Sequence, residues 1–355
     1  MKHIVGLALL ALTIPAAAQE AQEPATPTSV IAAASAEDWV AIAPADLLIM
    51  DLSPDARGNA RRVMIQLMPP PFSQPWVANI RTLAAAHWWD GTSVNRVQDN
   101  YVTQWGDVTE AKPLPEGVVS PVADYAATGL IAVPDPRGRP RLNYTLGMLM
   151  VRNARLAANG DLAVSDEMRQ ALEGNAQTSP SELSMPEVGD RYAGIATFVA
   201  GWPVGGNFSL HGREAEAFWP IHCYGAVGVG RNMAPDTGTG AELYTIIGQP
   251  QRHMDRNLAV VGRVIEGMEH LSSLPRGSGD LGFYTEEEAD LRVSILSVRL
   301  GSELADAPAF EYLDTASESF ARYVAVRANR NDAFYTVPAG GVDVCSVQVP
   351  VRRAE

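Results

Sequence analysis

Cysteine is scarce in this sequence. Its 355 residues include only Cys223 and Cys345, together with six scattered histidines. Structural zinc sites need closely spaced cysteine and histidine ligands, so this spacing argues against bound metal. In an exported protein the two cysteines can persist as a disulfide, which would tie the C-terminal tail to the middle of the chain. Two free thiols are the alternative.

Basic residues are also in deficit. The chain has 27 lysines and arginines against 41 aspartates and glutamates, which gives a net charge of −14. Nucleic-acid binding depends on lysine and arginine contacts with phosphates, and the sequence has no basic stripe with interleaved aromatics. The composition therefore argues against a nucleic-acid partner, and solubility alone accounts for the acidity.

Common cofactor and nucleophile motifs are missing. Gly228-Val229-Gly230 lacks the third glycine and the following helix of a dinucleotide site. No G-x-S-x-G segment of a serine hydrolase occurs. We therefore expect a protein that works without a cofactor.

An apolar run occurs at the N-terminus, from Ile4 to Ile14, behind a short basic start. It is too short to span a membrane, which needs about 20 apolar residues. Small residues at Ala16–Ala18 suit cleavage before Gln19. The pattern predicts a signal peptide over residues 1–18, a periplasmic location and no membrane span; a buried N-terminal helix is the alternative.

Folded structure is expected to begin after a flexible leader at residues 19–37, which is rich in alanine, proline, threonine and glutamine. Residues 46–52 and 62–67 are typical of strands. The segment between them contains proline, aspartate, glycine and asparagine, which favour turns. The two strands are therefore predicted to form a hairpin.

A helix is predicted after Ser73, a residue type that caps helices, with Pro75 in the first turn. Its apolar residues recur at helical spacing and form one face: Trp76, Val77, Ile80, Leu83 and Ala84.

The rest of the chain divides into three parts. Residues 108–219 are rich in proline, glycine and charge, and we interpret them as an insertion. From His222 to Leu300, short strands alternate with turns, and one short helix is expected at 267–274. Residues 301–355 form a C-terminal extension. Many short strands with few helices predict a mostly β, closed antiparallel barrel.

Two segments carry a family resemblance. The first, Val77–Asp107, contains a helix and then an aromatic-Asp-Gly turn. The segment N-R-V follows, in which Arg96 lies five positions before Tyr101, and Q-W-G-D ends the match. The second, Tyr224–Gly267, includes ELYTIIGQPQRHMDRNLAVVGRVIEGM. In this order and spacing the chain resembles the cyclophilins, which are peptidyl-prolyl cis-trans isomerases.

The resemblance implies an eight-stranded barrel with a helix over each open end, in a domain spanning residues 38–300. The block at 108–219 is then a large insertion where most cyclophilins have a shorter loop. The activity implied is isomerisation of X–Pro bonds, and the partners are proline-containing segments of exported proteins.

The chemistry of this reaction suits an arginine. Rotation about the X–Pro bond faces a resonance barrier of about 18–20 kcal/mol and breaks no bond. An enzyme must bind the twisted amide better than either planar isomer. A guanidinium is always charged and offers several rigid donors, so it can hydrogen-bond the prolyl nitrogen as that atom becomes pyramidal.

The resemblance assigns roles by position. Arg96 stands at the catalytic arginine, and Gln104 at the glutamine that positions substrate carbonyls. Tyr101 and Val102 take the aromatic and apolar positions of the proline pocket, and Tyr244 matches a second pocket aromatic. A surface strand position is the alternative for Arg96 and Gln104, and core packing for the other three.

Other substrate-site positions depart from the family pattern. Arg231 occupies an asparagine position whose backbone commonly pairs with the peptide, and Glu242 stands where glutamine is usual. His253 lies where many members have tryptophan or histidine, and Met254 where they have leucine. Leu258 replaces a histidine or tyrosine that often contacts substrate.

These departures keep a second hypothesis open, in which the barrel is a peptide-binding or chaperone module with weak or no turnover. Leu258, Glu242 and the long insertion favour it, whereas the retained Arg96 and Gln104 favour the enzyme.

Overall fold

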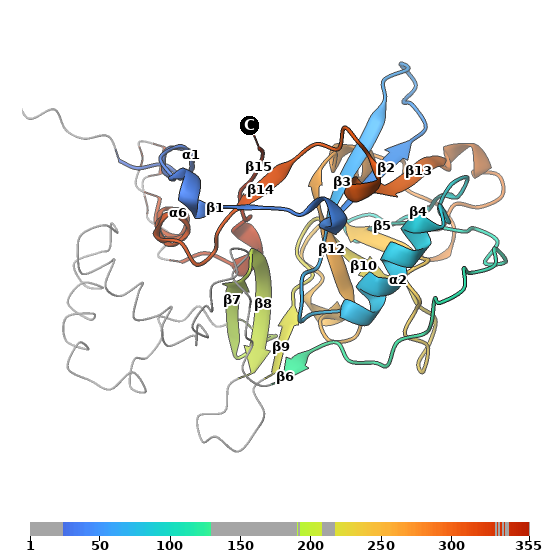
Figure 1. Cartoon of the computed structure of the whole chain (residues 1–355), viewed down its shortest axis with the longest axis horizontal. Coiled ribbons are helices and arrows are strands. Elements are labelled where there is room, and N and C mark those ends of the chain that lie inside the picture. The colour runs from blue at the N-terminus through green and yellow to red at the C-terminus, as the bar shows by residue number, and fades with distance from the viewer. Residues whose placement is uncertain are drawn as a thin grey trace, which may run out of the picture.

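The structure is a computed structural model that describes residues 24–128, 190, 192–207, 217–330, 332, 334, 335, 337 and 341–354. The signal-peptide prediction for residues 1–18 and most of the predicted insertion lie outside these residues. Figure 1 shows two parts, a barrel and an outer layer of strands and helices beside it.

Eight antiparallel strands form the barrel: β2 (Leu47–Leu52), β3 (Arg61–Leu67), β4 (Ser93–Val97), β5 (Val102–Gly106), β10 (Ala226–Val229), β11 (Leu243–Ile246), β12 (Val260–Glu266) and β13 (Ile295–Leu300). Their order is β13-β2-β3-β12-β10-β11-β5-β4. The two end strands meet where Ser93 bridges Ser294 and the Val94 N–H donates to the Val293 carbonyl at 2.9 Å. The predicted fold class is therefore confirmed.

The predicted hairpin forms as β2 and β3, which pair from Leu47 opposite Gln66 to Leu52 opposite Arg61. Its turn is held by Asp55, whose carboxylate accepts the backbone N–H groups of Arg57 and Asn59, each at 2.8 Å. Both the hairpin and its turn are therefore as the sequence predicts.

Two helices belong to the barrel, α2 (Gln74–Ala85) and α5 (Glu269–Ser272). All five residues of the predicted apolar face of α2 are buried in the barrel core. Ser73 is the residue before α2, but within the described chain its side chain makes no capping hydrogen bond. Its backbone is left-handed, with φ of 54°, so the backbone turn rather than the hydroxyl begins the helix.

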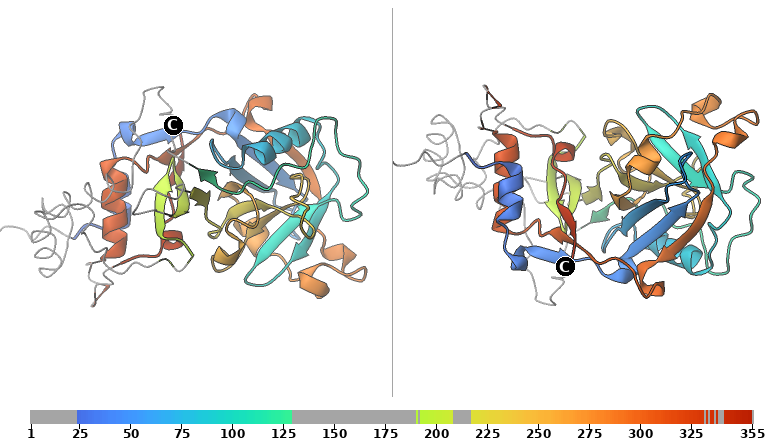
Figure 2. Two further views of the ribbon diagram at one scale, coloured as in Figure 1. Left: turned by 90° about the horizontal axis from the view of Figure 1, so that it is seen from below. Right: turned by 90° about the horizontal axis from the view of Figure 1, so that it is seen from above.

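The outer layer contains two small sheets and two helices. A four-stranded sheet has the order β6 (Ala127–Thr128), β9 (Ala217–Pro220), β8 (Trp202–Asn207) and β7 (Ile195–Val199). A three-stranded sheet has the order β1 (Trp39–Ala41), β14 (Phe310–Leu313) and β15 (Val351–Arg353). Helices α1 (Pro27–Ala32) and α6 (Glu318–Ala328) lie on the side away from the barrel (Figure 2).

The leader differs from its prediction. Part of the expected flexible segment 19–37 forms α1, because Thr26 accepts the Ser29 N–H at 3.1 Å and Val30 is buried. Val30 packs in a second core, together with Phe320 of α6. The tail therefore supplies the apolar surface that gives the leader a structure.

Arginine and aromatic side chains join the two parts. Arg263 on β12 donates to the Gly201 carbonyl at 2.7 Å and lies 4.7 Å from the Trp202 ring centroid. The outer layer thus packs against the barrel wall through specific contacts.

Short 3-10 turns complete the chain at Ala36–Asp38, Pro44–Asp46, Arg252–Met254, Asp280–Gly282, Ala289–Leu291, Gly301–Glu303 and Val344–Ser346. Among the residues that the structure covers, no helix is long and apolar enough to cross a membrane.

Candidate functional site

Arg96 lies on β4 opposite Gln104 of β5. The register between these strands shifts between Val94 and Arg96, a bulge with Asn95 as the extra residue. Bulges re-aim side chains and are common next to active sites. Here the bulge lets the consecutive residues Asn95 and Arg96 both reach polar groups of the same cluster.

Three hydrogen bonds orient the Arg96 guanidinium. Its Nη1 donates to Gln104 Oε1 at 3.1 Å, and its Nη2 donates to Gln98 Oε1 at 2.5 Å. Its Nε donates to the Leu281 carbonyl at 2.7 Å. These partners are amide and carbonyl oxygens, so they hold the guanidinium without neutralising its charge.

Aromatic rings flank the same guanidinium. The Arg96 Cζ lies 5.5 Å from the Tyr101 ring centroid and 5.2 Å from that of Phe283. Tyr101 also stacks on His253, with centroids 6.3 Å apart. Burial lowers the pKa of Arg96 from its ordinary value, yet a guanidinium stays protonated at neutral pH. The result is a half-buried cation beside apolar rings.

Glu242 of β11 completes the cluster. Its Oε2 accepts from Asn95 Nδ2 and Gln104 Nε2, each at 3.4 Å. Burial raises the pKa of Glu242 to about 7. Because the Gln104 amide donates to Glu242, its oxygen is free to face Arg96. The carboxylate lies over Gly106, where an added Cβ would come 1.8 Å from Glu242 Oε1.

Tyr244, predicted in the pocket, is 3% exposed. Its hydroxyl lies 2.9 Å from Nε2 of the buried His222, and His222 Nδ1 lies 2.9 Å from Asp255 Oδ1. In the tautomer whose Nδ1 donates to the Asp255 carboxylate, Nε2 accepts a hydrogen bond from the Tyr244 hydroxyl. Burial raises the pKa of Tyr244 well above its ordinary value, so the hydroxyl keeps its proton and can donate it in a hydrogen bond. The Tyr244 ring is thus held in place by the buried pair of His222 and Asp255.

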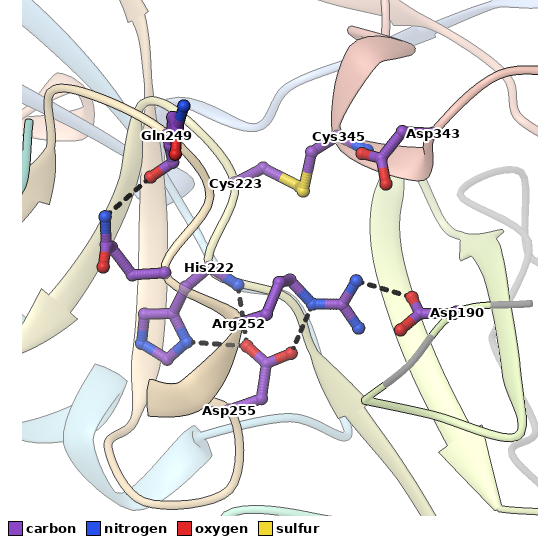
Figure 3. Close-up of a disulfide and its surroundings, with 9 residues drawn as sticks. Asp190, His222, Cys223, Gln249, Arg252, Asp255, Asp343 and Cys345 are labelled. Carbon is purple, nitrogen blue, oxygen red and sulfur yellow. Dashed lines mark hydrogen bonds and ion pairs between the residues drawn. A yellow bond between two sulfur atoms is a disulfide. The ribbon is translucent and has the colours of Figure 1, made fainter.

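The chain of contacts continues to the outer layer (Figure 3). Arg252 donates to Asp255 Oδ2 at 2.7 Å and to Asp190 Oδ2 at 2.5 Å. The neighbouring Cys223 forms a disulfide with Cys345, with Cα atoms 5.1 Å apart. The disulfide alternative from the sequence is therefore confirmed, and it ties the tail to the connection between β9 and β10.

The other predicted substrate residues differ in burial and in their contacts. Val102 is 1% exposed and packs in the barrel core, as does Met254 at 4%. Leu258 is half-buried against that core. The Arg231 guanidinium donates to the Asn257 carbonyl, with Nη2 at 3.1 Å. Among the contacts of the described residues, those of Arg231 lie outside the Arg96 cluster.

Several residues of this region were not expected from the sequence. Asn95 gives no local signal because its contact depends on the bulge. Leu281 and Phe283 lie in a glycine-rich turn that reads as a loop, and only tertiary pairing brings them to Arg96. His222 carries no recognisable motif, and only the folded structure brings it to Tyr244.

Comparisons with known proteins agree with this fold. The model of the family described as cyclophilin type peptidyl-prolyl cis-trans isomerase/CLD matches residues 72–300. The crystal structure of cyclophilin AquaCyp293 from Hirschia baltica is similar, with a TM-score of 0.56 and 18% identity. That match covers 93% of this chain and 98% of that chain, so the similarity in fold reaches beyond the barrel. No curated protein sequence matches the chain.

Proposed function

The chain belongs to the cyclophilin type peptidyl-prolyl cis-trans isomerase family, and on that premise we propose that Arg96 and Gln104 catalyse X–Pro isomerisation in exported proteins. Family and fold indicate the isomerase activity. The residue roles and the exported substrates are our proposal. The observation that carries it is the charged guanidinium of Arg96, held by neutral oxygens beside aromatic rings.

The reaction needs a donor that strengthens its contact as the amide twists. In the planar amide the prolyl nitrogen shares its lone pair with the carbonyl, whereas in the twisted state that lone pair can accept a hydrogen bond. Arg96 donates at this point, and the interaction is stronger in the transition state than in either ground state. No covalent bond to the enzyme forms.

Gln104 and Tyr101 position the substrate in this proposal. Gln104 holds Arg96 through its Oε1 and is itself oriented by Glu242. The half-buried ring of Tyr101 offers an apolar face for the proline ring next to the guanidinium. Orienting the peptide in this way lowers the entropic part of the barrier.

Two observations support exported proteins as substrates. The pattern over residues 1–18 is typical of a signal peptide. The Cys223–Cys345 disulfide suits an oxidising compartment such as the periplasm. The mass of the protein recovered from the producing cell tests this location, since cleavage before Gln19 removes 18 residues; an uncleaved protein in the cytoplasm contradicts it.

The isomerase proposal is tested with Arg96→Ala in an NMR-exchange assay of an X–Pro peptide. We expect kcat/KM to fall by about 100-fold, equivalent to about 2.7 kcal/mol of transition-state stabilisation. Arg62→Ala is the matched control, because Arg62 lies on the distant strand β3 in an exposed pair with Asp51. Its rate should match the wild type.

Two other results contradict the proposal. A folded Arg96→Ala protein with a wild-type rate would remove Arg96 from the mechanism. A folded wild-type protein that binds X–Pro peptides without accelerating their isomerisation would favour the peptide-binding or chaperone module instead.

A further inference from the structure

A turn at residues 277–284 runs along the edge of β4 next to Arg96. The Gly277 N–H donates to the Val97 carbonyl and the Tyr284 N–H donates to the Asn95 carbonyl, each at 3.0 Å. Phe283 forms a β-bridge directly with Arg96. The turn therefore extends the sheet beside the candidate catalytic residue, and neither its position nor its side chains were expected from the sequence.

The backbone of this turn is closely constrained. The Gly279 N–H donates to the Phe283 carbonyl at 3.0 Å, and Glu288 Oε2 accepts the N–H groups of Ser278 and Thr285, each at 3.1 Å. Gly282 has φ of 81°, and a Cβ there would come 2.8 Å from Gln98. Only glycine allows such an approach, so the sequence fixes this turn against β4.

Leu281 sits at the tip of this turn in an unfavourable conformation. Its φ is 55°, in the left-handed region, and 65% of the residue is exposed. Residues other than glycine, asparagine and aspartate rarely adopt this conformation because it is sterically unfavourable for them. This conformation places the Leu281 carbonyl on Arg96 and its side chain in solvent, and strained backbone of this kind often lies at functional sites.

Leu281 and Phe283 both lie next to the Arg96 guanidinium, Leu281 through its backbone carbonyl and Phe283 through its ring. The Leu281 carbonyl accepts from Arg96 Nε at 2.7 Å, and Phe283, two residues on, is 38% exposed with its ring 5.2 Å from Arg96 Cζ. An extended peptide advances about 3.3–3.6 Å per residue. A side chain that reaches these residues therefore belongs to a residue one or two positions from the proline that Arg96 engages.

We propose that Leu281 and Phe283 are specificity-determining residues, which bind an apolar side chain one or two positions from the X–Pro bond of the substrate. This inference rests on the proposed role of Arg96. It selects, among proline-containing segments, those with an apolar residue close to the proline.

The test measures sequence preference in a series of short X–Pro peptides. A single leucine is moved through the two positions on either side of the bond in an otherwise glycine and alanine background. NMR exchange is used because a coupling protease would impose its own preference. We expect the wild type to favour leucine at one of these positions by about fivefold in kcat/KM over glycine, as burial of part of an apolar side chain would give.

Leu281→Asn should reduce this ratio to below about twofold. Asparagine tolerates the left-handed conformation, so this variant should unfold at the same or a higher temperature than the wild type. The matched control is Leu296→Asn, which changes an exposed leucine on β13 that is 55% exposed, and it should keep the wild-type preference.

An independent readout follows the Leu281 methyl resonances of the full chain during peptide addition. The leucine-containing peptide should shift them, and the glycine peptide should shift them less.

A wild type that is active but indifferent to leucine, or a Leu281→Asn protein that keeps the full preference, would overturn the inference while leaving the role of Arg96 intact. Loss of the role of Arg96 itself, seen as full activity in Arg96→Ala, would overturn both.

Discussion

Two arginines, Arg252 and Arg96, have contrasting partners. Arg252 binds two carboxylates, those of Asp255 and Asp190, whereas Arg96 binds only amide and carbonyl oxygens among the described residues. Burial acts to lower the pKa of both. At Arg252 the carboxylates outweigh it and raise the pKa, and at Arg96 the pKa is lowered.

The contrast distinguishes an arginine with a structural role, Arg252, from one that can act on a substrate, Arg96. A cation already neutralised by carboxylates holds two layers together and has little attraction left for a ligand. A cation fixed by neutral oxygens keeps an uncompensated positive charge, which can attract a substrate carbonyl oxygen or nitrogen lone pair. We refer to Asp190, Arg252, Asp255 and His222 as the closed cluster, and to Arg96, Gln104 and Glu242 as the open cluster.

The largest expected effect concerns the disulfide beside the closed cluster. Replacing Cys223 and Cys345 with serine releases a link across 122 residues. The chain-entropy model predicts a loss of about 5 kcal/mol in the free energy of unfolding for a loop of this size. Urea unfolding measures it, and wild type with a dithiol reductant should behave similarly. An unchanged midpoint in both would show that the outer layer needs no covalent link.

The next effect breaks the closed cluster itself. Asp255→Asn leaves Arg252 and His222 buried with a weaker acceptor, and we expect a loss of about 4 kcal/mol in the free energy of unfolding. Asp51→Asn is the control, because it makes the same change in an exposed pair with Arg62 and should cost below about 1 kcal/mol. Equal effects at the two positions would refute the distinction between clusters.

The smallest effect concerns the open cluster and depends on pH. The pKa of Glu242 is raised from 4.5 to about 7, so the folded chain keeps a proton that the unfolded chain releases. The free energy of unfolding should therefore fall by about 3 kcal/mol as pH rises through this interval, and then level off. Glu242→Gln should remove this decline.

Glu266 provides the matched control for Glu242. A hydrogen bond with Arg353 lowers its pKa, so Glu266→Gln should leave the decline between pH 4.5 and 7 in place. Urea unfolding at pH 5 and pH 8 distinguishes the variants. A wild type whose stability is the same at both values would show that Glu242 has an ordinary pKa.

The barrel was predictable because its signals are local. The turn residues between β2 and β3 and the apolar face of α2 specify their elements within a few residues of sequence. The motif around Arg96 and Gln104 likewise lies within two adjacent strands, so its spacing survives in the fold.

The outer layer and part of the site were not predictable for the opposite reason. Strand β1 is three residues long and pairs with β14, and α1 depends on apolar surface from α6. Leu281 and Tyr244 acquire their surroundings from distant segments. Neither periodicity nor turn chemistry carries that information, since each contact is set by tertiary packing.

The pairing of β1 with β14 has a consequence for how the chain acquires its shape. Trp39 lies opposite Leu313, and β14 in turn pairs with β15 almost at the C-terminus. During synthesis β1 cannot join its sheet until β14 has been made, because contacts this distant in sequence form late. Until then the backbone groups of β1 remain unpaired and accessible to chaperones and proteases, so the pairing with β14 protects a segment made much earlier.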